Sequence, residues 1–288
     1  MSAPSVPATP APIESAAGSW GLWKSQVNGL LRLEVKKYLF SKRALLLYFL
    51  AFLPVFPFLI WNLRAILVND LPDIAQASMF YAGMFQTLML HLVIFFACVI
   101  TFTNLFRGEV LEHSLHYYFL CPVRREVLVV GKYAAGQFAS WIIFLICVIV
   151  SFILAYIPYG DQGLQYFTSG PALGHLLAYM GVTVLAFLGY GAVFLFTGLL
   201  FRNPIVPAIV IWFWEGINAF LPATLQKISV SHYLISLCPV PLSGGPIRII
   251  VDPAPAWLSV PGLLLVTLGV LVLASLKIRH MEISYGGE

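Results

Sequence analysis

Residues 133–157 read YAAGQFASWIIFLICVIVSFILAYI, an apolar run without any charged side chain. An α-helix needs about 20 apolar residues to cross about 30 Å of hydrocarbon, so this run predicts a membrane-spanning helix. The whole chain has the same character, because 60% of its 288 residues are hydrophobic, 10% are charged and the mean hydropathy is +0.90. This composition excludes an ordinary soluble domain. The net charge of +4 is too small to indicate a nucleic-acid surface, so we expect the lipid bilayer, and no nucleic acid, as a partner.

The same length criterion, applied along the chain, predicts six spans. They cover residues of about 44–66, 76–106, 127–157, 171–200, 204–221 and 256–276. Pro54 and Pro57 are expected to kink the first span. Asn203 and Pro204 are a suitable N-cap and first-turn proline for the fifth. The sequence therefore predicts an all-α membrane protein with a six-span domain over residues 44–276.

Basic residues are distributed unevenly between alternate segments outside the spans. The segments on the side of the two termini contain all of the 16 Lys and Arg residues except Arg64, Lys227 and Arg248. Lys and Arg accumulate in cytoplasmic loops, so both termini are predicted to be cytoplasmic, in a bacterial cytoplasmic (inner) membrane. Residues 1–19, rich in proline and small side chains, are expected to form a disordered cytosolic tail, and residues 277–288 a cytosolic C-terminal tail.

Two apolar segments lie outside the predicted spans. Residues 20–43 are expected to form an amphipathic interfacial helix that enters the first span through an elbow. Its apolar residues at helical spacing are Val27, Leu31, Val35 and Tyr38. Residues 221–255 are too apolar for a free loop and too rich in proline for one span. We expect short outer re-entrant helices there, between spans five and six.

Residues 106–125 read FRGEVLEHSLHYYFLCPVRR and form the largest charged cluster of the chain. Glu109 and Glu112 lie one helical turn apart, and Leu111 and Leu115 lie four residues apart, so each pair shares a helix face. Proline disfavours continuation of a helix, and one follows at position 122. The pattern predicts a short amphipathic cytoplasmic helix between the second and third spans.

This segment resembles the coupling segment of ABC transporter permeases of the ABC-2 type. The family pattern contains two acidic residues, Gly-Thr-Leu, a proline, an arginine and a Gly-Lys pair that opens the third span. The residues at those positions are Glu109, Glu112, Ser114, Leu115, Pro122, Arg125, Gly131 and Lys132. His113-Ser114 replaces Gly-Thr, which keeps the hydroxyl group and loses the glycine. The amphipathic helix before the first span and the outer helices after the fifth are similar to elements of the same family.

The resemblance implies a permease subunit, most simply of an exporter, that pairs with a second permease copy or a homologue and with separate ABC ATPase subunits. ATP and Mg would be bound by those ATPases, and no cofactor by this chain. Leu111, Leu115 and Leu120 would supply apolar contact with the ATPase. Charge attraction would fix how the segment is aligned on the ATPase, through Glu109, Glu112, Arg124 and Arg125.

The chain is not expected to hydrolyse ATP itself. Glu126 stands where a P-loop before Gly131-Lys132 needs its first glycine, and Tyr133 stands where it needs Ser or Thr. We therefore predict no catalytic residue. A membrane-embedded enzyme and a membrane anchor or assembly subunit that transports nothing remain as alternatives.

The charged segment has two other interpretations. It would be an ordinary solvated loop if its basic residues only follow the positive-inside rule. Glu109, Glu112, His113 and His116 include pairs at helical spacing, but one helix would present only two or three of them on one side, whereas a structural zinc site normally needs four protein ligands. No metal is therefore predicted.

Glu215 is the one carboxylate inside a predicted span. An ionised carboxylate is costly there, so it should be protonated, paired or turned toward a polar cavity. It would either contact substrate or protons in a pathway, or fasten the fifth span to the outer helices by a hydrogen bond to Ser229, Ser231 or His232. Lone histidines in or near spans are expected to be packing residues, and a row of glycines in the fourth span to permit close helix contact. These residues are His91, His175, Gly181, Gly189, Gly191 and Gly198.

Overall fold

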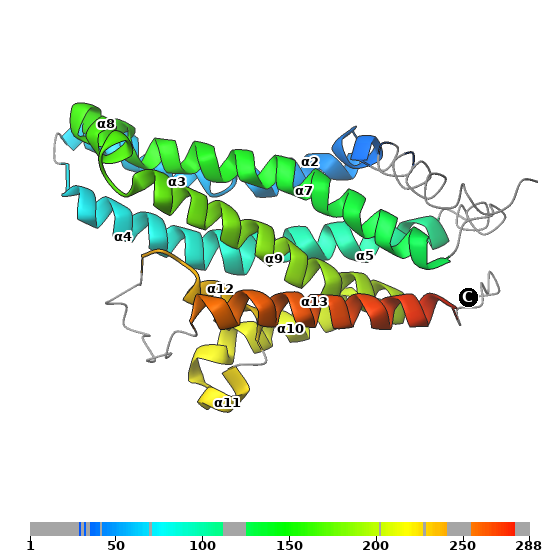
Figure 1. Ribbon diagram of the computed structural model, residues 1–288. Helices are drawn as coiled ribbons and strands as arrows, with labels where there is room; N and C mark the ends of the chain where they lie inside the picture. Colours follow the sequence, from blue (N-terminus) through cyan, green and yellow to red (C-terminus); the bar gives the residue numbers. More distant parts are fainter. Residues whose placement is uncertain are drawn as a thin grey trace, which may run out of the picture.

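The protein is a bundle of long helices (Figure 1). The computed structural model describes residues 29, 32, 35–40, 42–68, 71–111, 125–201, 203–226, 229–240 and 255–279. Every element within these ranges is a helix, which confirms the predicted all-α class.

Five helical segments in the described ranges are long and apolar enough to cross a bilayer. They are Ala44–Ala65, Ile74–Leu105, Val129–Thr168, Ala172–Leu200 and Ala256–Ile278. The first consists of α2 (Lys42–Phe52) and α3 (Val55–Val68), and the second of α4 (Ile74–Met84), η1 (Phe85–Ile94) and α5 (Phe95–Leu111). The others contain α7 (Arg125–Tyr156), α9 (Ala172–Leu200) and α13 (Ala256–Arg279). A turn at residues 53 and 54 separates α2 from α3, at the first of the two prolines predicted to kink this span.

The fifth predicted span, residues 204–221, is helical over most of its length, but its α-helix is shorter than the other spans. It contains α10 (Ile205–Ile217), a helix of 13 residues, followed by the 3₁₀-helix η3 (Asn218–Phe220). At 1.5 Å per residue α10 is about 20 Å long, which is shorter than the hydrocarbon core. Pro222 explains the end of the helical path, because a proline disfavours helical backbone at the residue before it. Leu221 accordingly has extended backbone angles, φ −83° and ψ 155°. The count of six spans is therefore not confirmed.

α9 is the central helix of the bundle and packs along α5, α7 and α13. Three of its four predicted contact glycines explain the close approach. A Cβ at Gly198 would lie 2.8 Å from the carbonyl oxygen of Thr103 on α5, and one at Gly191 would lie 2.9 Å from Phe102. A Cβ at Gly189 would come within 3.1 Å of side chains on α12 and α13. No atom lies within 4 Å of a Cβ at Gly181.

Side-chain hydrogen bonds to carbonyl groups also join the helices. Tyr133 and Gln137 of α7 donate to the carbonyl oxygens of Leu188 and Phe187 on α9, each at 2.7 Å. Hydrocarbon offers no water to polar groups, so such bonds have to be made inside the protein. They fix the rotation of α7 relative to α9.

The chain crosses the bundle in alternating directions. The start of α2, the end of α5, the start of α7 and the end of α13 lie at one end of the bundle in Figure 1. The end of α3, the start of α4 and α8 (Gly160–Thr168) lie at the other end. Gly160 has a positive φ of 52°, which permits the sharp change of direction before α8. The sequence did not predict α8 as a separate helix.

Candidate functional site

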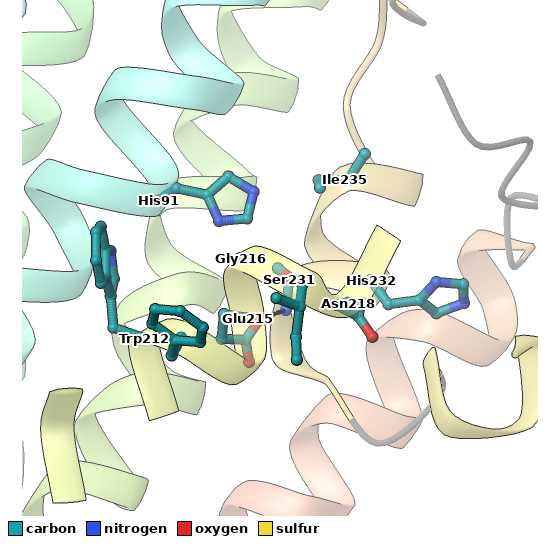
Figure 2. Close-up of a pocket in the computed structure, with 10 residues that line it drawn as sticks. His91, Trp212, Glu215, Gly216, Asn218, Ser231, His232 and Ile235 are labelled. Carbon is teal, nitrogen blue, oxygen red and sulfur yellow. Dashed lines mark hydrogen bonds between the residues drawn. The ribbon is translucent and has the colours of Figure 1, made fainter. Parts of the chain in front are cut away.

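Glu215 lies on α10 and joins it to the start of α12 (Val230–Ser236). The residue is 5% exposed. Oε2 accepts hydrogen bonds from Ser229 Oγ at 2.5 Å and from the backbone N–H of Ser231 at 3.2 Å, and Oε1 accepts one from the backbone N–H of Val230 at 3.2 Å. The Oγ atoms of Ser229 and Ser231 are 2.8 Å apart. The contacts therefore include two of the three partners that the sequence suggested. In Figure 2 the third, His232, points away from the carboxylate.

The local backbone explains why a carboxylate is held at this place. The first N–H groups of any helix have no acceptor within the helix. Ser229 has the extended conformation of an N-cap, φ −81° and ψ 138°, but its side chain makes no capping hydrogen bond to α12. Glu215 supplies the acceptor from another helix instead. Hydrogen bonds to an ionised acceptor are stronger than neutral ones, so the arrangement stabilises a carboxylate in an apolar setting.

A pocket of about 430 Å³ adjoins this carboxylate. Figure 2 shows that its walls come from η1, α10 and α12. Trp212, Phe213 and Ile217 line it from α10, and Ile235 lines it from α12. Trp212 also packs against Phe96 of α5, with ring centroids 6.0 Å apart. Trp212 is 40% and Phe213 is 65% exposed, so the pocket opens on the outer face of α10.

His91 projects from η1 toward α10 and lies within electrostatic range of Glu215 (Figure 2). It forms no ion pair with Glu215 among the described contacts. η1 is a π-helix of ten residues in the middle of the second span. Such segments are rare and occur frequently at functional sites, because the extra residue per turn changes the direction of the side chains. No periodicity of apolar residues in the sequence indicated this π-helix.

Tyr190 of α9 is a further residue beside Glu215. Its buried hydroxyl group lies close to the Glu215 carboxylate and the Ser231 hydroxyl, without reaching full hydrogen-bond geometry with either. Tyr190 was not predicted as a site residue, because an apolar helix contains many aromatic residues and only packing shows which one lies beside the carboxylate.

Most of the predicted coupling segment lies outside the described residues. Glu109 and Leu111 are helical at the end of α5, and Arg125 is the first residue of α7. Residues 112–124 lie outside the described ranges, and they include Glu112, His113, Ser114, Leu115, His116, Leu120, Pro122 and Arg124. The coupling, solvated-loop and metal interpretations therefore stay predictions.

The predicted interfacial helix is described in part. Val27 and Leu31 lie outside the described residues, whereas Val35 and Tyr38 lie within the helical residues 35–40. The Tyr38 hydroxyl donates a hydrogen bond to the carbonyl oxygen of Thr101 on α5 at 3.2 Å. This contact links the segment before the first span to the helix that leads into the coupling segment. Its place in the headgroup plane stays a prediction.

Five long apolar helical segments in the described ranges, joined by side-chain hydrogen bonds to carbonyl groups, define this chain as an integral membrane protein. The family model described as ABC-2 family transporter protein matches residues 30–216, about two thirds of the chain. The chain therefore belongs to the ABC-2 family of transporter proteins, which confirms the family resemblance seen in the sequence. No curated protein and no solved structure matches it. The matched range ends one residue after Glu215, so the carboxylate lies within it and its partners on α12 lie beyond it.

Proposed function

We propose that this chain is the membrane permease subunit of an ATP-driven transporter of the ABC-2 type, and that it exports its substrate. The observation that carries the proposal is the family match over a helical bundle with a pocket beside a buried carboxylate. Separate ABC ATPase chains would bind ATP and Mg, because Glu126 and Tyr133 replace two essential positions of a P-loop here.

The coupling segment, residues 107–125, would act as a lever. It connects α5 to α7, and these two helices end and begin at the same end of the bundle (Figure 1). A short rigid helix held in a groove of the ATPase would convert ATPase closure into rotation of both helices. α9 packs along α5 and α7 and also contacts α12, so the rotation would reach the walls of the pocket.

The topology that we propose has six crossings with both termini in the cytoplasm of a bacterial cell and the bundle in its inner membrane. The fifth crossing would be α10 together with η3, which at ordinary helical rises extends about 25 Å. The hydrogen bonds of Glu215 to α12 support this arrangement, because non-helical backbone at membrane depth has to be surrounded by protein.

A second permease copy or a homologue would complete the transporter. α10 supports this proposal, because Ile205, Val206, Ile209, Val210 and Phe213 are all more than half exposed in the single chain. A surface of this kind can be covered by another permease as well as by lipid tails. A second permease that covers this face of α10 would lie near the opening of the pocket beside Glu215.

The experiment that tests the function is isolation of the tagged chain in mild detergent, followed by identification of bound proteins and measurement of ATP turnover. We expect a P-loop ATPase to co-purify and its turnover to depend on this chain. Glu112→Lys combined with Arg125→Glu should reduce the recovery and stimulation of the ATPase. Asp161→Lys, on the exposed helix α8 at the opposite end of the bundle, is the matched charge control.

Two results would contradict the proposal. An isolated chain with hydrolytic activity of its own and no ATPase would support a membrane-embedded enzyme. A bound ATPase whose turnover is unchanged by the double charge reversal would remove the coupling assignment and leave an anchor or assembly subunit.

A further inference from the structure

Glu215 has hydrogen-bond donors but no cationic partner among the described residues. Its contacts are with one hydroxyl group and two backbone N–H groups, and none of these groups carries a full positive charge. Oε1 accepts one hydrogen bond, whereas a carboxylate oxygen has two lone-pair positions, so it can accept another. Buried charges in proteins are normally neutralised by a partner or lose their charge. The Tyr190 hydroxyl close to this carboxylate is uncharged, and His91 lies within electrostatic range without an ion pair, so among the described residues no positive group contacts Glu215 directly.

The pocket beside Glu215 has walls that favour an organic cation. Trp212 and Phe213 stand on the same helix as the carboxylate, and Ile217 and Ile235 complete an apolar lining. Tryptophan is the side chain whose face attracts a cation most strongly, and the attraction increases when water is excluded. Aromatic rings also give a flat apolar body a large contact area.

The size of the pocket fits the same class of ligand. Sites for small organic molecules usually have volumes of about 300–1,000 Å³ and combine apolar walls with a few polar groups that fix orientation. The pocket measures about 430 Å³, and besides the carboxylate it presents His91, Asn218 and Ser231. One charged group at the side of an aromatic wall suits a ligand with a single charge and an aromatic body.

We infer that this pocket binds a monovalent organic cation with an aromatic or bulky apolar body, its charge beside the Glu215 carboxylate and its body against Trp212 and Phe213. The inference rests on the proposed transport function, since it names the class of substrate that the permease takes up. Entry is lateral, through the exposed side of α10, from the bilayer or from the boundary with a second permease.

Binding of tetraphenylphosphonium to the purified full-length chain in phosphatidylcholine nanodiscs tests this inference. Tetraphenylborate, an anion of the same shape, is the control ligand, and empty nanodiscs give the background. We expect saturable binding of the cation to the natural chain. Trp212→Leu should weaken it about fivefold, which is the effect of one partly desolvated cation–π contact. Glu215→Gln should weaken it about tenfold or more, because it removes the charge partner.

The set of variants separates ligand binding from folding. Trp212→Leu leaves the hydrogen bonds between Glu215 and α12 in place, so it decides the question even if Glu215→Gln does not fold. Asp161→Asn removes a carboxylate on exposed α8, away from the pocket, and should bind the cation as the natural chain does.

Three outcomes would overturn the inference. The first is no saturable binding of tetraphenylphosphonium to the natural chain, as expected if Glu215 is neutral. The second is unchanged cation affinity in Trp212→Leu and Glu215→Gln. The third is an equal loss of cation and anion binding in both variants, which would show a pocket without charge selectivity. Cation binding by a chain that recruits no ATPase would contradict the transport function alone. ATPase stimulation without cation binding would contradict this inference alone.

Discussion

Glu215→Ala removes the acceptor of three hydrogen bonds and tests whether a carboxylate on α10 holds α12 in place. The backbone N–H groups of Val230 and Ser231 would lose their acceptor. Each buried donor left unsatisfied costs about 1–3 kcal/mol. The Ser229 hydroxyl would keep Ser231 Oγ as a neighbour at 2.8 Å, so its loss is smaller. Measured losses of helix caps are about 0.5–2 kcal/mol, which places the total effect at about 2–4 kcal/mol.

Glu215→Gln should cost less, about 1–2 kcal/mol, because the glutamine oxygen can still accept from one backbone N–H group and its amide can donate to Ser229. The order of stability should therefore be natural chain, Gln variant, Ala variant. For a chain of this size we expect the apparent Tm of the Ala variant in detergent to fall by about 5–15 °C.

Two measurements check this expectation. Detergent-stability curves give the apparent Tm, and hydrogen exchange followed by mass spectrometry reports on the amides of α12. The exchange of Val230 and Ser231 should accelerate in the Ala variant while α9 keeps its protection. Asp161→Ala, on the exposed face of α8, should change the Tm by no more than about 1 °C. An Ala variant with unchanged Tm and unchanged exchange in α12 would refute the reasoning.

Two further substitutions test the packing of the bundle. Gly198→Ala places a Cβ 2.8 Å from the carbonyl oxygen of Thr103 and should destabilise the chain by about 1–3 kcal/mol, measured as a lower Tm. The control Gly181→Ala places a Cβ with no atom within 4 Å and should be neutral or slightly stabilising. Equal Tm values for the two glycine variants would contradict the close approach of α5 and α9. Tyr38→Phe removes the hydrogen bond to the carbonyl oxygen of Thr101 and should cost about 1 kcal/mol. Hydrogen exchange should detect this loss as faster amide exchange in residues 35–40. Unchanged exchange would show that this contact does not hold residues 35–40 against α5.

The family and most of the helices could be predicted from the sequence. An uncharged run such as residues 133–157 has one low-energy solution in a bilayer, because a helix satisfies its own backbone hydrogen bonds. The glycines of α9 also indicated close contact, and Gly189, Gly191 and Gly198 make it. Gly181 does not, since its face meets no neighbour. A small residue permits close packing but does not say where the next helix lies.

The details of the candidate site were only partly predictable. Glu215 stood out because a carboxylate in an apolar run is rare. Its serine partners could be proposed because the segment that follows α10 in the sequence contains several hydroxyl groups. Three features had no local signal in the sequence: the π-helix that carries His91, the approach of Tyr190 to Glu215, and the pocket beside α10. Each depends on how helices from distant parts of the chain pack together.

The sequence by itself determined that this protein lies in a lipid bilayer, that it is helical and which family it belongs to. Hydrophobicity and motif spacing are local properties of the chain and need no knowledge of the packing. Only the tertiary structure decided that the carboxylate of α10 caps another helix and that an aromatic pocket opens beside it. The physical reason is that a buried charge takes its partners from whatever the fold brings within hydrogen-bonding distance, and those distances are set by helix packing.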